Sequence, residues 1–240
     1  MIDEVTDIRA HAATLVRQDC PGRFGAVHVR RLDAADTKTR RPLVFLHPSP
    51  YSGAYFETVM PLLNEQRTII APDYPGYGES APPTPRPTIG DYALAIFDCL
   101  DSLSIAQADV VGFHTGCLVG AEMALHQPAR IASLILIDIP YYVGAARSDM
   151  YARAVEVDTA EDERTRWGFH AAFTYASDER LPLVATPAHI IATQSSLLEP
   201  TRQASRMLPN CKLIERLDIT RLVFEDHTRP IANAILEALA

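Results

Sequence analysis

The chain has 240 residues, of which 48% are hydrophobic, and a formal net charge of −8. A chain of this length and composition can bury a substantial core within one domain. No basic run or patch is present to neutralise phosphates, so the composition argues against nucleic acid as a partner. We expect an ordinarily soluble protein whose partner is a small molecule, and the composition predicts no particular oligomeric state.

The four cysteines, Cys20, Cys99, Cys117 and Cys211, are widely spaced and form no C-x-x-C pair. This spacing indicates neither a zinc site nor a disulfide framework, so we expect no metal and no cofactor. Residues 1–15 are acidic and lack the apolar segment of a secretory signal, and no apolar run is long enough to span a bilayer. We therefore expect a cytoplasmic protein without a membrane partner.

The first half of the chain alternates short apolar runs with helical patterns. Residues 1–20 are interpreted as a lead-in that contains at most a short helix. Apolar runs bounded by prolines are typical of strands that are buried on both faces, whereas apolar residues at helical spacing indicate amphipathic helices. Strands are predicted at 25–32, 42–47 and 68–71, and helices at 52–64 and 91–103.

The same alternation continues in the second half, with one interruption. Strands are predicted at 110–112, 131–139, 189–193 and 212–217, and helices from about 115 to 126, at 200–207 and at 228–239. Strands that alternate with helices predict a parallel sheet covered on both faces, with ligands at the carboxyl ends of the strands. Residues 140–183 interrupt this rhythm, and their position predicts a lid.

A conspicuous motif lies in the stretch from Val110 to Ala121, which has the pattern of a strand, a tight turn and the start of a helix. Residues 112–116, GFHTG, have the spacing of the G-x-S-x-G nucleophile elbow. Small residues at both ends of this motif let the chain reverse sharply and hold up the middle side chain. That middle residue is His114 in this chain, so the motif favours a fold more strongly than a reaction.

The order of the motifs resembles the α/β-hydrolase superfamily from about Gly25 to Ala240. The resemblance is carried by PLVFLHPSP, APDYPGYGES, VGFHTG, LILIDIP and TPAHIIATQSSLLEP, followed by the last strand and helix. It implies an α/β-hydrolase fold: a mostly parallel central sheet flanked by helices, with a small helical lid. We expect residues 1–139 and 184–240 to form the core domain and residues 140–183 to form the lid.

The superfamily implies a nucleophile at the elbow, an acid after the strand that follows the lid, and a histidine after the last strand. In this sequence the nucleophile position falls on His114. The acid position falls on Ser195 or Ser196, and the histidine position falls near Thr220 or Arg221. Every side chain of the usual triad is therefore replaced.

The oxyanion hole implied by the resemblance uses two backbone N–H groups, those of Ser49 and Thr115. Backbone donors survive changes of side chain, so a pocket for an anion or a carbonyl remains an expectation. His47 precedes this loop, and we expect it to shape the loop through hydrogen bonds rather than to act on substrate.

The imidazole of His114 can accept a proton from water or substrate, or attack an acyl group directly. Either role needs an orienting partner, and Asp138 is the candidate because it ends the strand next to the elbow. Some members of the superfamily, including a branch of the haloalkane dehalogenases, carry their catalytic acid there. The alternative is that Asp138 only caps its loop. His227 is a further candidate, which we expect to face solvent.

Aromatic residues in the predicted lid are candidates for lining a substrate pocket. They are Tyr141, Trp167 and His170, and the alternative is that they pack against the sheet. Cys117 lies one turn into the helix after the elbow and is expected to be a buried, inert thiol.

The sequence therefore predicts an α/β-hydrolase-fold protein that hydrolyses a small ester, thioester or related acyl substrate by a non-serine mechanism. Two alternatives stay open: a cofactor-free lyase, and a catalytically inactive pseudo-hydrolase that binds a small apolar ligand. The loss of three triad side chains favours the inactive protein. An elbow kept around an ionisable residue favours the enzyme.

Overall fold

The strands of the computed structural model form one eight-stranded sheet with the order β1-β2-β4-β3-β5-β6-β7-β8. The structure describes residues 14–34, 40–156 and 163–240. β1 pairs with β2, and β2 with β4, in antiparallel orientation, whereas the remaining neighbours are parallel. The predicted α/β fold with a mostly parallel central sheet is confirmed.

The strands are β1 (Val16–Cys20), β2 (Val27–Leu32), β3 (Leu43–Leu46), β4 (Ile69–Pro72), β5 (Ala108–Phe113), β6 (Ile131–Ile137), β7 (Ala188–Thr193) and β8 (Cys211–Arg216). The helices are α1 (Ile89–Ser102), α2 (Thr115–His126), α3 (Gly144–Glu156), α4 (Arg164–Thr174), α5 (Ser177–Arg180), α6 (Leu198–Ser205) and α7 (Thr228–Ala238). Short 3₁₀ turns are η1 (Gly53–Phe56), η2 (Met60–Leu62), η3 (Pro128–Arg130) and η4 (Leu181–Leu183).

Two expectations about the first half of the chain are wrong. The lead-in expected over residues 1–20 ends in β1, an edge strand whose polar sequence VRQDC has no apolar periodicity and which forms by pairing with β2; residues 1–13 lie outside the described residues. The expected helix over residues 52–64 is instead the two separate 3₁₀ turns η1 and η2. Pro61 is the second residue of η2 and has no N–H to donate, so the chain does not continue from η1 as one regular helix.

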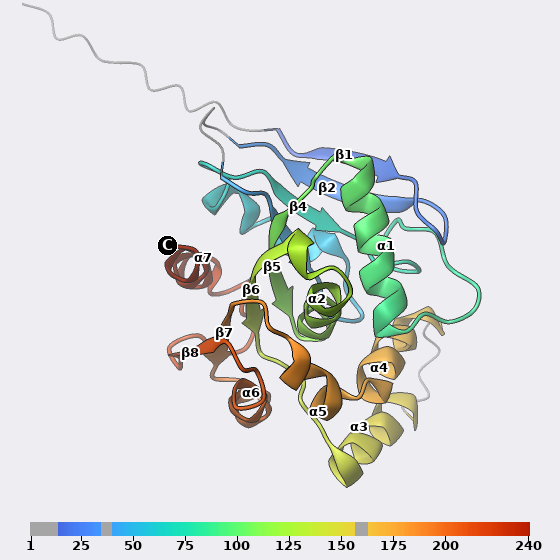
Figure 1. Cartoon of the computed structure of the whole chain (residues 1–240), viewed down its shortest axis with the longest axis vertical. Helices are drawn as coiled ribbons and strands as arrows, with labels where there is room; N and C mark the ends of the chain where they lie inside the picture. Colours follow the sequence, from blue (N-terminus) through green and yellow to red (C-terminus); the bar gives the residue numbers. More distant parts are fainter. Residues whose placement is uncertain (1–13, 35–39, 157–162) are drawn as a thin grey trace, which may run out of the picture.

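The core consists of two apolar layers, one on each face of the sheet. Val44 and Leu46 of β3 face the layer that contains α1 and α2, whereas Leu43 and Phe45 face the layer that contains η1, η2 and α7. Figure 1 shows α1 and α2 on one side of the sheet and α7 on the other. Both faces of β3 are therefore buried, which explains its unbroken apolar sequence.

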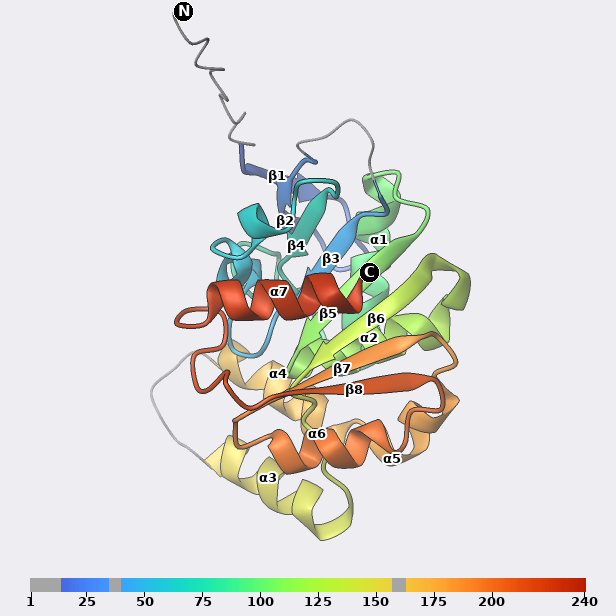
Figure 2. The same cartoon turned by 90° about the vertical axis from the view of Figure 1, so that its left-hand side faces the viewer.

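The segment that follows β6 forms α3, α4, α5 and η4. These helices gather at one end of the molecule in both views (Figures 1 and 2), and α4 contacts α1 and α2. Within the described residues, no helix combines the length and the apolar character needed to cross a bilayer.

A buried charge pair fixes the loop that follows β4. The carboxylate of Asp73 is fully buried and contacts the guanidinium of Arg30, with 2.6 Å between Oδ1 and Nη1. It also accepts hydrogen bonds from the N–H groups of Gly53 (2.7 Å) and Glu79 (3.0 Å). One side chain thus joins β2, the start of η1 and the loop after β4.

Replacing this carboxylate tests the arrangement. Asp73→Asn removes the buried carboxylate partner of Arg30, which keeps its contact with Glu57 at 2.8 Å, and weakens the acceptor of the Gly53 and Glu79 N–H groups, so we expect a loss of about 2 kcal/mol in the free energy of unfolding. Asp218→Asn, which removes an exposed partner of Arg216, is the matched control and should leave the unfolding midpoint close to that of the wild type. Urea denaturation of the two variants measures the difference, and equal midpoints would contradict the role of Asp73.

Candidate functional site

A cavity of about 550 Å³ opens at the carboxyl ends of the parallel strands. This volume lies in the range of small-molecule sites. Four of the residues predicted from the sequence line it together, namely His114, Asp138, Ser196 and Arg221. The other lining residues are Pro48, Tyr51, Tyr55, Phe113, Gln194, Ser195, Thr220, Leu222, Val223 and Glu225. We call this space the His114 cavity.

The backbone at His114 reverses between β5 and α2 with φ 49° and ψ −114°. Its N–H donates to the carbonyl of Ile137 (3.1 Å), and its carbonyl accepts from the N–H of Cys117 (2.9 Å). The turn packs so tightly on β3 that a Cβ at Gly116 would lie 2.0 Å from the carbonyl oxygen of Leu46. Glycine is therefore required at this position, as the motif indicates.

Backbone strain is concentrated around the His114 cavity. Four described residues other than glycine have a positive φ: Ser104, His114, Asp138 and Leu222. Three of the four, all except Ser104, line this cavity. Such conformations cost free energy in L-residues and accumulate at functional sites, so the distribution of strain marks the cavity as a functional candidate.

The imidazole of His114 is half-buried and neutral at physiological pH. Desolvation lowers the pKa of His114 to about 4. The ring lies against the ring of Phe113, with 3.9 Å between the centroids. No hydrogen bond or ion pair joins the His114 side chain to another residue in the described part of the chain. The ring nitrogens are therefore open to a ligand in the cavity.

Asp138 does not orient His114. Its fully buried carboxylate accepts hydrogen bonds from the N–H of Thr193 (2.8 Å) and from Thr193 Oγ1 (2.6 Å). Burial raises the pKa of Asp138, and the bonds from Thr193 act in the opposite direction. The expected pairing with His114 is wrong in this structure, because both carboxylate oxygens bind Thr193 at the end of β7, whereas His114 follows β5 on the opposite side of β6.

The other positions that the resemblance assigns to a triad also border the cavity. Ser196 and Arg221 line it, as do Ser195 and Thr220. Thr220 Oγ1 lies 3.0 Å from Nε2 of His227, which is half-buried rather than fully exposed to solvent as expected. The imidazole of His114 lines the cavity, whereas His227 is not among the lining residues and contacts it only through Thr220.

His47 ties together the two loops at the edge of this region. It is fully buried; its Nδ1 donates to the carbonyl of Pro48 (3.0 Å), and its Nε2 accepts from the N–H of Tyr74 (3.0 Å). These partners require the neutral tautomer with the proton on Nδ1. Desolvation lowers the pKa of His47 to about 4, which keeps that tautomer neutral.

The predicted oxyanion donors are the N–H groups of Ser49 and Thr115. Thr115 is the first residue of α2, where helical N–H groups have no partner within the helix. No hydrogen bond from either N–H to another described residue is present, so both remain available. Neither Ser49 nor Thr115 is among the residues that line the His114 cavity, although their neighbours Pro48 and His114 are.

The structure does not bring the three aromatic lid candidates to this cavity. Tyr141 is buried in the core layer of α1 and α2. Trp167 lies against Gly76, and the ring of His170 packs on the ring of Tyr151, 5.3 Å away. The alternative reading as packing residues fits these positions.

Helix α4 nevertheless touches the loop that contains Ser49. The N–H of Gly168 donates to the hydroxyl of Tyr77 (2.6 Å). A Cβ at Gly168 would lie 1.8 Å from Ser49 Oγ, so the contact depends on glycine. The segment after β6 therefore rests on the loop of the predicted oxyanion donor.

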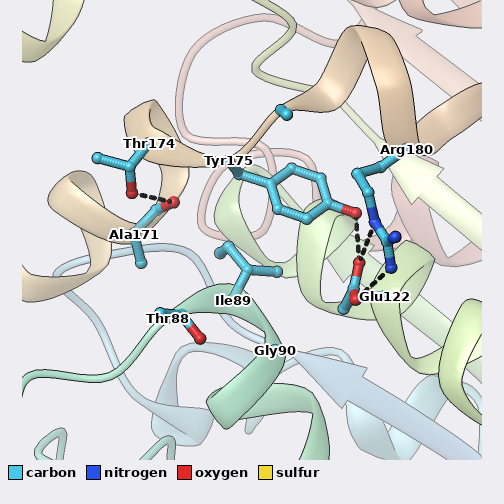
Figure 3. A pocket seen from close by; sticks show the side chains of 9 residues that line it. Thr88, Ile89, Gly90, Glu122, Ala171, Thr174, Tyr175 and Arg180 are labelled. Atoms are coloured by element: carbon cyan, nitrogen blue, oxygen red, sulfur yellow. Dashed lines mark hydrogen bonds and ion pairs between the residues drawn. The ribbon is translucent and has the colours of Figure 1, made fainter.

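A second, smaller cavity of about 380 Å³ lies between the helices α1 and α2 and the segment that contains α4 and α5 (Figure 3). Its wall includes Glu122 of α2, a buried carboxylate that accepts from Arg180 Nη2 (2.6 Å), Arg180 Nε (3.1 Å) and the hydroxyl of Tyr175 (2.7 Å). Figure 3 shows the three side chains converging on one another. This cluster links the segment after β6 to the helix that begins at His114.

Sequence reasoning missed much of the cavity wall. Tyr51, Tyr55, Leu222 and Glu225 lie in loops or a short 3₁₀ turn. The sequence around these residues has no strand or helix periodicity from which a cavity-lining position could be predicted. The only local signal is the position of the two tyrosines in the turn after the buried strand β3.

A model of the alpha/beta hydrolase fold matches residues 41–208. The chain belongs to this family. Among curated relatives, the 2-hydroxymuconate semialdehyde hydrolase of Pseudomonas sp. (strain CF600) is 33% identical over 114 residues, which cover 45% of this chain and 39% of that protein. The fluoroacetate dehalogenase of Burkholderia sp. is 31% identical over 119 residues, 47% of this chain and 39% of that protein. The chain thus spans about two fifths of the length of the relatives it matches.

Solved structures agree with this α/β-hydrolase fold over most of the chain. The enol-lactonase from Burkholderia xenovorans LB400 superposes with a TM-score of 0.77 at 16% identity and covers 92% of this chain and 99% of its own. The esterase EaEST from Exiguobacterium antarcticum gives a TM-score of 0.78 at 15% identity, over 93% of this chain and 99% of its own. At these identities the likeness shows the fold alone.

The lowered pKa values predict how stability depends on pH. His47 and His114 each have a folded pKa of about 4, below the 6.5 of an exposed histidine. As the pH falls below about 6.5, the unfolded chain binds protons that the folded chain does not, so the free energy of unfolding falls towards pH 4. Urea titrations between pH 7 and 4.5 should show a shallower fall in His114→Gln than in the wild type. Equal slopes would contradict a neutral, desolvated His114.

The Glu122 cluster gives a second prediction. In Glu122→Gln the amide cannot form the charge-assisted bonds to Arg180, so we expect α5 to separate from α2 more often and the protein to lose roughly 2 kcal/mol of stability. Limited proteolysis should then cut faster within residues 140–183. Asp101→Asn, which removes the exposed partner of Arg130, is the control. Unchanged cleavage in Glu122→Gln would show that other contacts hold the segment.

Proposed function

We propose that the protein is a hydrolase of a small acyl substrate, such as an ester or thioester, and that the site is the His114 cavity. The observation that carries this proposal is the strained His114 at the carboxyl end of β5, with an open, neutral imidazole that lines a cavity of ligand size. In this proposal residues 112–116 are a nucleophile elbow in which histidine takes the place of serine.

The neutral imidazole supports two routes. As a general base, it takes a proton from water that attacks the substrate carbonyl. As a nucleophile, it bonds to the acyl carbon while the alcohol or thiol leaves, and water then cleaves the acyl-imidazole. In both routes the N–H groups of Ser49 and Thr115 would donate to the developing oxyanion, which the start of α2 also favours electrostatically.

The pairing of Asp138 with Thr193 limits how efficient this chemistry is. An imidazolium at His114 would form without a carboxylate beside it, in a site whose desolvation already disfavours the charged form. General bases act best when their pKa lies near the working pH. A base with a pKa of about 4 is weak, so we expect slow turnover and a substrate with a good leaving group.

We further propose that residues 140–183 act as a lid over a core formed by residues 1–139 and 184–240. The contact of Gly168 with the loop of Ser49 and the bonds between Glu122 and Arg180 support this role. Movement of α4 would change the packing around Ser49, and with it the position of one proposed oxyanion donor.

The relatives support hydrolysis as the reaction class. The 2-hydroxymuconate semialdehyde hydrolase is a hydrolase by name, and its match includes 45% of this chain. Fluoroacetate dehalogenase, the other relative, acts on a different bond according to its name. The likeness therefore favours a hydrolytic reaction and leaves the bond and the substrate to experiment.

A second candidate function is ligand binding without turnover. It is favoured by the same pairing of Asp138 with Thr193, because His114 then lacks an orienting acid, and by Ser196 and Arg221 at the two other triad positions. A receptor or binding protein needs the cavity and the lid but no base.

Purified protein assayed with a panel of small nitrophenyl esters and thioesters tests the proposal. His114→Ala should lower kcat/KM by about 100-fold or more if the imidazole is the base or nucleophile. His126→Gln, at the far end of the same helix, should retain activity within about twofold. Hydrolysis that survives His114→Ala would remove His114 from the mechanism. Saturable ligand binding with no hydrolysis in the wild type would establish the second candidate.

A further inference from the structure

The wall of the His114 cavity is mainly apolar and partly open to solvent. Phe113 and Val223 contribute buried apolar surface, whereas Tyr51 is 52% exposed and Leu222 is 45% exposed. Large apolar side chains that remain exposed at a cavity are typical of a ligand-binding surface. A ligand that covers them has an apolar or aromatic body.

Three charged residues line this wall, and two of them are already engaged. Asp138 is bonded to Thr193, and Glu225 accepts a hydrogen bond from the hydroxyl of Tyr55 (2.9 Å). The third is Arg221, and no described residue forms a hydrogen bond or an ion pair with its guanidinium. Its planar fork of N–H donors is therefore free for a ligand.

Arg221 differs in this respect from the buried or half-buried arginines Arg30, Arg67 and Arg180, and it shares the lack of a partner among the described residues with exposed arginines such as Arg206 and Arg229. Arg30, Arg67 and Arg180 each contact a carboxylate at 2.5 to 2.6 Å. Arg221 lines a cavity of ligand size, so its unpaired guanidinium can bind a ligand there.

The loop that carries Arg221 is fixed by hydrogen bonds and burial. The N–H of Gln194 donates to the carbonyl of Ile219 (2.8 Å), and the N–H of Asp226 donates to the carbonyl of Leu222 (2.9 Å). Leu222 itself has φ 63°, a conformation that is costly for a leucine, while the following Val223 is buried. The strained backbone thus holds Arg221 and Leu222 together at the cavity.

We propose that the His114 cavity binds a small organic acid, or an acyl substrate that carries a carboxylate, whose anion pairs with Arg221. Its apolar part lies against Tyr51, Phe113 and Leu222, and its reactive carbonyl lies towards His114. Guanidinium binds carboxylate through two parallel N–H···O bonds, which gives direction as well as affinity. The substrate assignment rests on the proposed function, whereas binding of the anion needs no turnover.

Calorimetry with 3-phenylpropionate and its neutral analogue 3-phenylpropanamide tests the proposal. The two probes have the same apolar body and differ in charge. We expect the wild type to bind the acid about tenfold more tightly than the amide, and we expect added salt to lower the affinity for the acid only. Arg221→Gln should lower the affinity for the acid about tenfold and change the affinity for the amide by no more than about twofold. Arg221→Lys should have an affinity for the acid between those of the wild type and Arg221→Gln. Arg229→Gln, on the exposed surface of α7 outside the cavity wall, is the matched control and should bind as the wild type does.

Several outcomes would overturn the inference. Equal affinity for acid and amide, equal effects of Arg221→Gln and Arg229→Gln, or no binding of either probe would each exclude Arg221 as an anion site in this cavity. Arg221 is exposed, so its variants should keep the wild-type circular dichroism spectrum and unfolding midpoint. The two proposals fail separately: wild-type acid binding in a protein that hydrolyses no ester removes only the proposed function. Hydrolysis of neutral esters without any preference for an anionic one removes only this inference.

Discussion

The turn between β5 and α2 brings Gly116 against the backbone of Leu46 on β3 so closely that no side chain fits between them. This contact forces the chain to reverse within a single residue, which leaves His114 at φ 49° with its side chain at the carboxyl end of the sheet. It also sets the start of α2, and with it the direction of the N–H of Thr115. The position of α2 in turn brings Glu122 to the segment after β6.

The buried polar side chains of His47 and Asp138, near the cavity, have hydrogen-bond partners at both of their polar atoms. His47 uses both ring nitrogens on backbone groups, and Asp138 uses both carboxylate oxygens on Thr193. Such satisfied groups hold the surrounding loops in one arrangement, because breaking any of the bonds leaves a buried polar atom without a partner. The groups that remain uncommitted, the imidazole of His114 and the guanidinium of Arg221, are then the ones free to respond to a ligand.

The sharp turn at His114 belongs to the fold and does not by itself establish a reaction. The packing at Gly116 is needed for the sheet and for α2 whatever residue stands at position 114. Asp138 and Leu222 also have a positive φ, and both residues border the same cavity as His114. The concentration of strain there supports a site that has been kept for a ligand, with or without turnover.

The sequence by itself determined the α/β architecture. Buried strands such as β3 and β4 are continuous apolar runs, whereas in helices such as α1 the apolar residues recur about every 3.6 residues. It also located the turn at His114 from the glycine spacing. It did not reveal β1, whose polar edge sequence becomes a strand only through its pairing with β2.

Only the tertiary structure decided which side chains meet. Asp138 was expected beside His114, yet its partner Thr193 is 55 residues away in sequence and adjacent to it in the sheet, because β6 pairs with β7 in parallel register. Tyr51 and Leu222 approach the same cavity from loops that follow β3 and β8, where no periodic pattern marks a face. Local periodicity reports which residues are buried within one element, whereas the partners of a side chain depend on how distant elements are placed against each other.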